Sequence, residues 1–235
     1  MLPNIYSTYV RLFLELKLNI WRKDMSLFLG KIHYWLFNKI VWFEDLEEEI
    51  INLAKKEGLD VESLSSEINN KYGERLPKMP LEDMIDTSNI HGWLQEKIHS
   101  AEYRLATWTV KILEKDSCKE KLEDLYINQG LKAADEVIMS EKVLNNAVDI
   151  FNSVNDYILD GMPCDRVNEV LSQEEDKVVW KRRICVHKEI WDTVGGDVNL
   201  FYNLRDLWVK SFVNKVNNNY KYNCLGNNDF SIERV

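Results

Sequence analysis

The sequence predicts an all-α fold, a bundle of about seven or eight helices that forms a single domain over residues 1–235. Only four prolines and nine glycines interrupt the 235 residues, which favours long helices over many short strands. Hydrophobic residues make up 45% of the chain, enough for one large core. The longest segments also place their apolar residues at helical spacing, which is the direct signal for helix.

Two long helices, over residues 25–57 and 88–115, are predicted to form the centre of the bundle. Asp24 is a suitable N-cap for the first helix, and Gly30 lies inside it. Residues 4–22 fit two patterns, because their apolar residues alternate as in a strand but also form a helical face. The length of this segment without a turn residue favours the helix. The helical face consists of Tyr6, Tyr9, Phe13, Leu16 and Ile20.

Caps and turn residues define the shorter elements that follow. Asp60 caps a helix that Gly73 closes, and residues 74–86 form an extended connection. Residues 131–159 have the pattern of an amphipathic helix, and Gly130 is a candidate interruption before it.

The last third of the chain ends in a segment of different character. Ser172 and Glu175 match a capping box for a helix that continues to about Thr193. Asp197 caps a further helix that is rich in aromatic residues. Apolar residues alternate in the tail over residues 219–235, which predicts a small C-terminal β-hairpin or an irregular tail.

A short pattern in the first central helix recurs 58 positions later in the second. Seven of thirteen positions are identical, which suggests an internal duplication without establishing it. The matched residues are Ile32, His33, Trp35, Leu36, Lys39, Ile40 and Glu44 in the first copy and Ile90, His91, Trp93, Leu94, Lys97, Ile98 and Glu102 in the second.

The histidine and the glutamate of each copy share the apolar stripe of their helix, at about 100° per residue. Buried polar groups need partners, since each unpaired one costs about 1–3 kcal/mol. If the helices pack antiparallel, His33 faces Glu102 and His91 faces Glu44, which gives two structural pairs. If they pack parallel, the histidines meet at one level and the glutamates at another, which would leave a place for a metal or ligand.

The net charge of −9 makes the chain acidic, and no basic patch with interleaved aromatic residues is present. Nucleic-acid binding is therefore not expected, whereas a basic partner surface would suit this charge. Residues 25–43 form the most apolar run, but its charged residues predict a buried helix rather than a membrane span. The chain lacks a secretion-signal pattern, and its four cysteines form no disulfide or zinc framework. We therefore expect a cytoplasmic, reduced protein.

Two acidic motifs lie at the end of the first central helix, Glu44 with Glu47 and Glu57 with Asp60. They resemble the motifs of the all-helical nucleotide pyrophosphohydrolases, and the resemblance implies carboxylates that hold magnesium against a triphosphate. It covers fewer than twenty residues, and Gly58 interrupts the second motif. Magnesium needs carboxylates that converge from a rigid frame, so a solvated acidic helix end is the alternative.

Two further patterns are candidates for chemistry. Glu96 and His99 form a single E-x-x-H, whereas a ferritin-like di-iron site needs two such motifs. Cys164 follows Pro163 near an expected helix N-terminus, where the pKa of a thiol is lowered, and His187 is its candidate base. The sequence identifies no third group that would orient the histidine, so an inert, buried cysteine is the alternative.

Together these observations favour a soluble helical binding or regulatory module with a protein partner or a small molecule as its ligand, because no complete catalytic motif is present. The alternative is a metal-dependent enzyme, a metal-assisted hydrolase or an oxidoreductase. Its divalent ion would be held in the helical core by His33, Glu44, His91 and Glu102. The sequence leaves open whether the chain is an enzyme and whether it forms a homo-oligomer.

Overall fold

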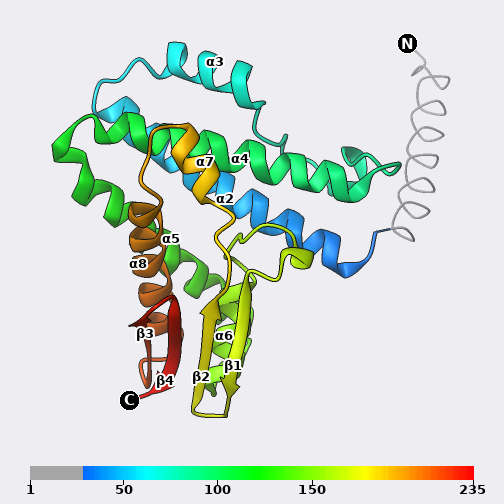
Figure 1. Cartoon of the computed structure of the whole chain (residues 1–235), viewed down its shortest axis with the longest axis vertical. Coiled ribbons are helices and arrows are strands. Elements are labelled where there is room, and N and C mark those ends of the chain that lie inside the picture. Colours follow the sequence, from blue (N-terminus) through cyan, green and yellow to red (C-terminus); the bar gives the residue numbers. More distant parts are fainter. Residues whose placement is uncertain (1–28) are drawn as a thin grey trace, which may run out of the picture.

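A four-stranded antiparallel sheet accompanies the helices of this chain in the computed structural model, which describes residues 29–235 (Figure 1). The helices are α2 (Lys31–Lys56), α3 (Val61–Tyr72), α4 (Ile90–Leu113), α5 (Lys119–Met139), α6 (Ala147–Asn155), α7 (Lys188–Thr193) and α8 (Val198–Val216). The strands are β1 (Asn168–Gln173), β2 (Lys177–Arg182), β3 (Tyr220–Gly226) and β4 (Asp229–Arg234). The predicted all-α fold class is therefore wrong, and the fold is mixed α/β. The expectations for residues 4–22 and for a cap at Asp24 lie outside the described residues.

The sheet joins two hairpins that are distant in the sequence. β1 pairs with β2, β3 pairs with β4, and β2 pairs with β4, so the strand order is β1-β2-β4-β3. The C-terminal hairpin that the alternation in residues 219–235 predicts is present as β3 and β4. In Figure 1 the sheet lies at one end of the molecule, where α6 and α8 pack against it.

The helix expected over residues 172–193 is instead the end of β1, the strand β2 and the short helix α7. Within β2, Val178 and Trp180 are buried and alternate with more exposed residues, which is the period of a strand. The apparent capping box lies at the hairpin turn, where the N–H of Glu174 donates to the carbonyl oxygen of Lys177 at 2.8 Å. Turns and capping boxes use the same polar residues, so the local sequence fits either a hairpin or a helix. Pairing of β2 with β4 stabilises the hairpin.

The two repeat helices, α2 and α4, run side by side in the same direction (Figure 1). The segment that contains α3 runs back in the opposite direction and connects the end of α2 to the start of α4. The ring centroids of His33 and His91 are 5.7 Å apart at the N-terminal ends. Further along, Arg104 of α4 reaches Glu47 of α2. The helix predicted after Asp60 is present as α3, and the Asp60 side chain accepts a hydrogen bond from its first turn at 3.1 Å.

Two glycines have roles other than those expected. Gly30 is the N-cap of α2 and not part of its interior. Gly130 does not interrupt α5, but it allows a close approach to α8, since a Cβ there would lie 2.5 Å from the carbonyl oxygen of Trp208. The single helix expected over residues 131–159 is divided, because α5 ends and Asn146 caps α6.

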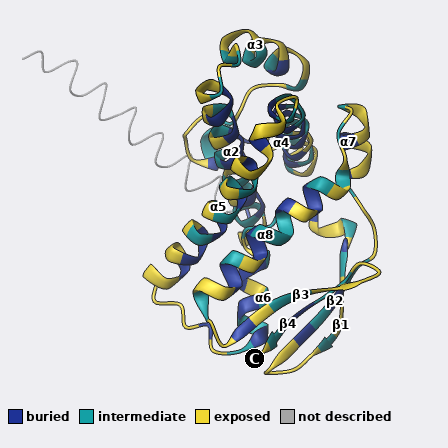
Figure 2. Cartoon of the chain, turned by 90° about the vertical axis from the view of Figure 1, so that its left-hand side faces the viewer, coloured by how far each residue is buried: buried dark blue, intermediate teal, exposed yellow. Residues whose placement is uncertain are grey.

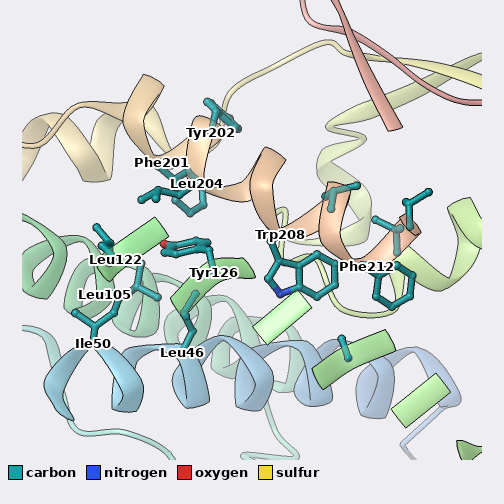
Figure 3. Close-up of a cluster of buried hydrophobic side chains, with 14 of the residues drawn as sticks. Leu46, Ile50, Leu105, Leu122, Tyr126, Phe201, Tyr202, Leu204, Trp208 and Phe212 are labelled. Carbon is teal, nitrogen blue, oxygen red and sulfur yellow. The ribbon is translucent and has the colours of Figure 1, made fainter. Parts of the chain in front are cut away.

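The main hydrophobic core lies where α2, α4, α5 and α8 meet, and Figure 2 shows buried residues along these inward sides. Figure 3 shows Leu204 and Trp208 projecting from α8 toward α2. A smaller cluster near the start of α2 contains Leu29, Leu36, Ile40, Leu94, Ile98 and Leu159. None of the helices within residues 29–235 combines the length and the apolar character that a membrane crossing requires.

Candidate functional site

The two repeat histidines lie close together in the first turns of α2 and α4, but outside the core. His91 is exposed and His33 is half-buried. The N–H of Gly30 donates to Nδ1 of His33 at 3.1 Å. Burial and the neighbouring His91 both lower the pKa of His33. The helices thus adopt the parallel arrangement, but the expectation that both histidines lie inside is wrong, because the first turns of both helices reach solvent.

Glu44 of the first copy has Arg104, a fully buried residue of α4, as its partner. Nη2 of Arg104 pairs with Glu44, and Nε lies 3.0 Å from Oε1 of Glu47. Nη1 donates to two backbone carbonyl oxygens just after α3, and the N–H of Leu76 donates to the Glu44 carboxylate at 3.0 Å. The carboxylates of the motif that resembles the pyrophosphohydrolases are therefore held by a guanidinium group.

One guanidinium group serves two buried carboxylates in this cluster, so one negative charge is in excess. Burial raises the pKa of Glu47 to about 7, although Arg104 opposes the shift. Burial also raises the pKa of Glu44. The cluster fastens α2, α4 and the chain after α3 to one another.

Glu102 of the second copy lies in a different buried cluster, with His187 as its closest partner. Nδ1 of His187 is 2.7 Å from Oε1 of Glu102, a close ionic contact without the alignment of a hydrogen bond. Nε2 of His187 is 3.0 Å from Oδ1 of Asp160, and Nη1 of Arg205 is 2.5 Å from that same oxygen. These four residues come from α4, the start of α7, the loop after α6, and α8, so the cluster joins four parts of the fold.

The charges of this second cluster balance when the imidazole is protonated. Burial alone would lower the pKa of His187, but Glu102 and Asp160 outweigh it and raise that pKa. Burial alone would raise the pKa of Asp160, but Arg205 and His187 outweigh it and hold that pKa well below its usual range. Lys39 of α2 lies close enough to interact with Asp160 and Arg205, yet its burial lowers its own pKa to about 8.

Cys164 is exposed, and His187 is fully buried between two carboxylates. Nδ1 of His187 faces Glu102, and Nε2 lies 3.0 Å from both Asp160 and Nη2 of Arg205, so neither nitrogen is directed at a thiol. Cys185 accepts a hydrogen bond from the Tyr202 hydroxyl at 3.1 Å. This arrangement does not assemble the nucleophile and base that the sequence suggested.

The four residues proposed to hold a metal are divided among three places: the histidine pair at the starts of α2 and α4, the Arg104 cluster and the His187 cluster. Within residues 29–235, no three His, Cys, Asp or Glu residues are grouped so that they could hold a metal ion. The E-x-x-H pair also has other contacts, because Glu96 pairs with Lys97 at 2.9 Å and His99 with Gln95 at 2.7 Å.

An open hollow runs along the outer side of α2, with a volume of about 830 Å³. We call it the α2 hollow. Its α2 residues fall within about 120° of one another at 100° per residue. They are Lys31, Tyr34, Trp35, Asn38, Val41 and Trp42. Glu136 of α5 and, beyond the end of α6, Asp156 and Tyr157 form the opposite side.

A second hollow of about 840 Å³ lies on the adjacent side of α2 and shares Asn38 and Val41 with the first. Its other residues come mainly from α2 and from the chain after α3. Asn38 and Val41 therefore form an exposed ridge on α2 that separates the two hollows. The sequence marked Trp35 only as a member of the repeat and did not single out Val41 or Trp42, although aromatic residues on both sides of a helix in residues 34–43 are a detectable signal.

Lys39 lies between the aromatic wall of the α2 hollow and the charges of the His187 cluster. The indole N–H of Trp35 donates to Oδ1 of Asp156 at 3.0 Å, at the rim of the hollow. Nζ of Lys39 lies 3.7 Å from the centroid of the Trp35 ring, in a cation–π contact. Lys39 in turn interacts with Asp160 below. The aromatic wall of the hollow is thus coupled to the buried charges through the electrostatic effect of Lys39.

Sequence reasoning had no way to identify Asp160 and Arg205, which are separated by 45 positions and meet only through the fold. Arg104 did leave a signal, because it lies between Ala101 and Leu105 on a strongly apolar helix. The sequence matches no protein-family model, and no curated protein or solved structure is significantly similar to it. Function is accordingly inferred from geometry and chemistry.

Proposed function

We propose that this chain is a binding module whose α2 hollow holds a basic, amphipathic helix of a partner protein. The observation that carries the proposal is the row of half-buried aromatic residues on α2 that line the hollow. Tyr34, Trp35 and Trp42 line the hollow there, and Val41 keeps 37% of its surface exposed. Surface helices usually direct charged residues outward, so an apolar stripe of this kind indicates a contact surface.

The shape and charge of the hollow support a helical peptide as its occupant. The hollow of about 830 Å³ is open and extends along the axis of α2 from Lys31 to Trp42, which suits an elongated occupant such as a helix. Amphipathic helices bind in such grooves through apolar residues at helical spacing. Glu136 and Asp156 stand on the far side of the hollow, and the whole chain carries a net charge of −9. Basic residues on the polar side of the peptide would meet Glu136, whereas Asp156 already pairs with Lys142 at 3.2 Å.

The buried clusters support a binding role over a catalytic one. Glu102 keeps 3% of its surface exposed and His187 keeps none, so a substrate would not reach either group. His187 already contacts Glu102 and Asp160, and Asp160 pairs with Arg205, so the groups that could act as acid or base are occupied. The clusters hold the helices in position, whereas the side chains of the α2 hollow are ones that a ligand could reach.

A pair of synthetic peptides tests the proposal. One is an amphipathic helix of Leu and Lys, about 18 residues long so that it spans the hollow from Lys31 to Trp42, and the other replaces each Lys by Glu. Isothermal titration calorimetry should show binding of the Lys peptide and at least tenfold weaker binding of the Glu peptide. Val41→Glu, which places a charge on the ridge, should weaken binding of the Lys peptide at least tenfold.

Val143→Glu is the matched control, because Val143 is 67% exposed in the chain before α6 and lies outside the hollow. It should bind the Lys peptide as the wild-type chain does. Equal binding of the two peptides, or equal loss in both variants, would contradict a specific site on α2.

A further inference from the structure

We propose that a small pocket between the sheet and the helices α6 and α8 binds a zwitterionic amino acid of about the size of glycine. We call it the sheet pocket. Its volume of about 50 Å³ corresponds to about four water-sized groups, which suits a ligand of about five non-hydrogen atoms. The sheet pocket shares no residue with the α2 hollow, so this inference is independent of the function proposed above.

Aromatic side chains of the sheet form one wall of the sheet pocket. Trp180 of β2 and Phe230 of β4 are paired in register, and their ring centroids are 5.8 Å apart. The rings of Tyr222 and Phe230 are nearly parallel, with their centroids 6.1 Å apart. From the helical side, the ring of Phe151 in α6 lies 4.8 Å from that of Trp180. Because these rings hold one another in place, the pocket has a fixed shape and little side-chain entropy is lost when a ligand binds.

Four charged residues line the sheet pocket, and two of them neutralise each other. Nη1 of Arg205 lies 2.5 Å from Oδ1 of Asp160. The other two, Arg182 of β2 and Asp206 of α8, are half-buried and form no ion pair with any residue between 29 and 235. A partly buried charge without a counterion is unfavourable. One positive and one negative group that face the same pocket are therefore complementary to a ligand that carries both charges.

Uncharged neighbours hold the carboxylate of Asp206 in position. The Tyr222 hydroxyl donates to its Oδ1 at 2.6 Å, and the Cys224 thiol donates to its Oδ2 at 3.1 Å. Burial raises the pKa of the Cys224 thiol to about 11, Asp206 adds to this shift and Arg182 opposes it. Both charges consequently lie near this thiol. Each oxygen of a carboxylate can accept more than one hydrogen bond, so Asp206 can also bind an ammonium group.

The guanidinium group of Arg182 is also held in position. Its central carbon lies 3.4 Å from the centroid of the Tyr202 ring, and its Nη2 donates to Oδ1 of Asn228 at 2.7 Å. The other N–H groups are available to a carboxylate, whose two oxygens match the planar guanidinium group. An α-amino acid carries its ammonium and carboxylate groups on one carbon. Its carboxylate would bind Arg182 while its ammonium group binds Asp206.

Calorimetric titration of the full-length chain with three ligands of equal size tests the need for both charges. Glycine carries both charges, glycinamide carries only the positive one, and glycolate carries only the negative one. A ligand of about five non-hydrogen atoms binds with a Kd of about 3 μM at the tightest, so each titration should extend to about 10 mM. Glycine should bind at least about tenfold more tightly than either analogue, because each charged contact is lost in one of them. Leucine should not bind, since its side chain exceeds the pocket.

Two variants assign the charges to residues. Arg182→Gln should weaken glycine binding at least about tenfold and should bind glycine and glycinamide alike, because the partner of the carboxylate is gone. Asp206→Asn should bind glycine and glycolate alike for the corresponding reason. Arg183→Gln is the matched control, because Arg183 is the next residue, is exposed and contacts Glu169 at 3.5 Å. It should bind glycine as the wild-type chain does.

The wild-type titrations alone can overturn the inference, so it does not depend on whether a variant folds. Absence of glycine binding, or equal affinity for glycine, glycinamide and glycolate, would show that the sheet pocket is not a site for a zwitterion. An equal loss of glycine binding in Arg183→Gln and Arg182→Gln would overturn the assignment to Arg182.

Discussion

Glu47→Gln is expected to stabilise this protein above neutral pH and to leave it unchanged near pH 4.5. Glu47 keeps 1% of its side chain exposed and competes with Glu44 for the single guanidinium group of Arg104. Burial raises its pKa from 4.5 to about 7. At 1.36 kcal/mol per pKa unit, the charged form costs the folded state roughly 3 kcal/mol. The glutamine side chain resembles the protonated acid and avoids this cost.

The sign and the pH window follow from proton linkage. The folded state keeps the Glu47 proton to a higher pH than the unfolded state, so the wild-type chain loses stability as the pH rises from 4.5 to about 7. Denaturant unfolding at pH 4.5, 5.5, 6.5 and 8 should therefore show a growing advantage for the variant. The advantage should increase by about 1.4 kcal/mol per pH unit and become constant above pH 7.

Glu48→Gln is the matched control, because Glu48 is the next residue on α2, keeps 42% of its side chain exposed and pairs with Arg75 at the surface. It should change the free energy of unfolding by less than about 0.5 kcal/mol at each pH. If Glu47→Gln instead destabilised the protein at pH 8, Glu47 would be a charged partner that Arg104 fully compensates. The argument from two acids and one base would then be refuted.

Three further predictions concern other parts of the fold. Glu102→Leu should lower the free energy of unfolding by about 3–5 kcal/mol, because it removes one partner of the buried His187. A double-mutant cycle on Glu102 and His187 should show a coupling energy of at least about 1 kcal/mol. Gly130→Ala should cost about 1–3 kcal/mol in thermal unfolding, since its methyl group would collide with the backbone of α8. At pH 7.5 iodoacetamide should label exposed Cys164 well before Cys224, because burial and then Asp206 raise the pKa of the Cys224 thiol to about 11.

Helices with local signals could be predicted from the sequence. Asp60 and Asp197 both cap the helices expected after them, because a cap acts within one turn of its own helix. The hairpin of β1 and β2 could not be predicted with the same reasoning. Its register depends on β4, which pairs Val178 with Ile232 across 54 positions. Single-sequence patterns contain no direct information on such a partner.

The lack of information on distant partners also explains why the buried clusters could be predicted only in part. The polar residues Glu44 and Glu102 on apolar stripes correctly indicated buried partners, because an unpaired carboxylate in a core is costly. The identity of those partners, Arg104 and His187, did not follow from the repeat. The two copies have similar sequences but different surroundings, since only the second helix packs against α7. A repeat in sequence therefore led to two different buried clusters.

Both clusters meet on α4, and this explains how the outer side of α2 keeps its orientation. Arg104 holds α2 through Glu44 and Glu47, while Glu102, two residues earlier, holds the loop and helices around His187. Buried ion pairs of this kind add little net stability over apolar residues of similar volume. They do select one register, because a slip of either helix would leave a charge without a partner. We infer that this register keeps the aromatic stripe of α2 facing outward, and that the polar interior thereby preserves the binding surface.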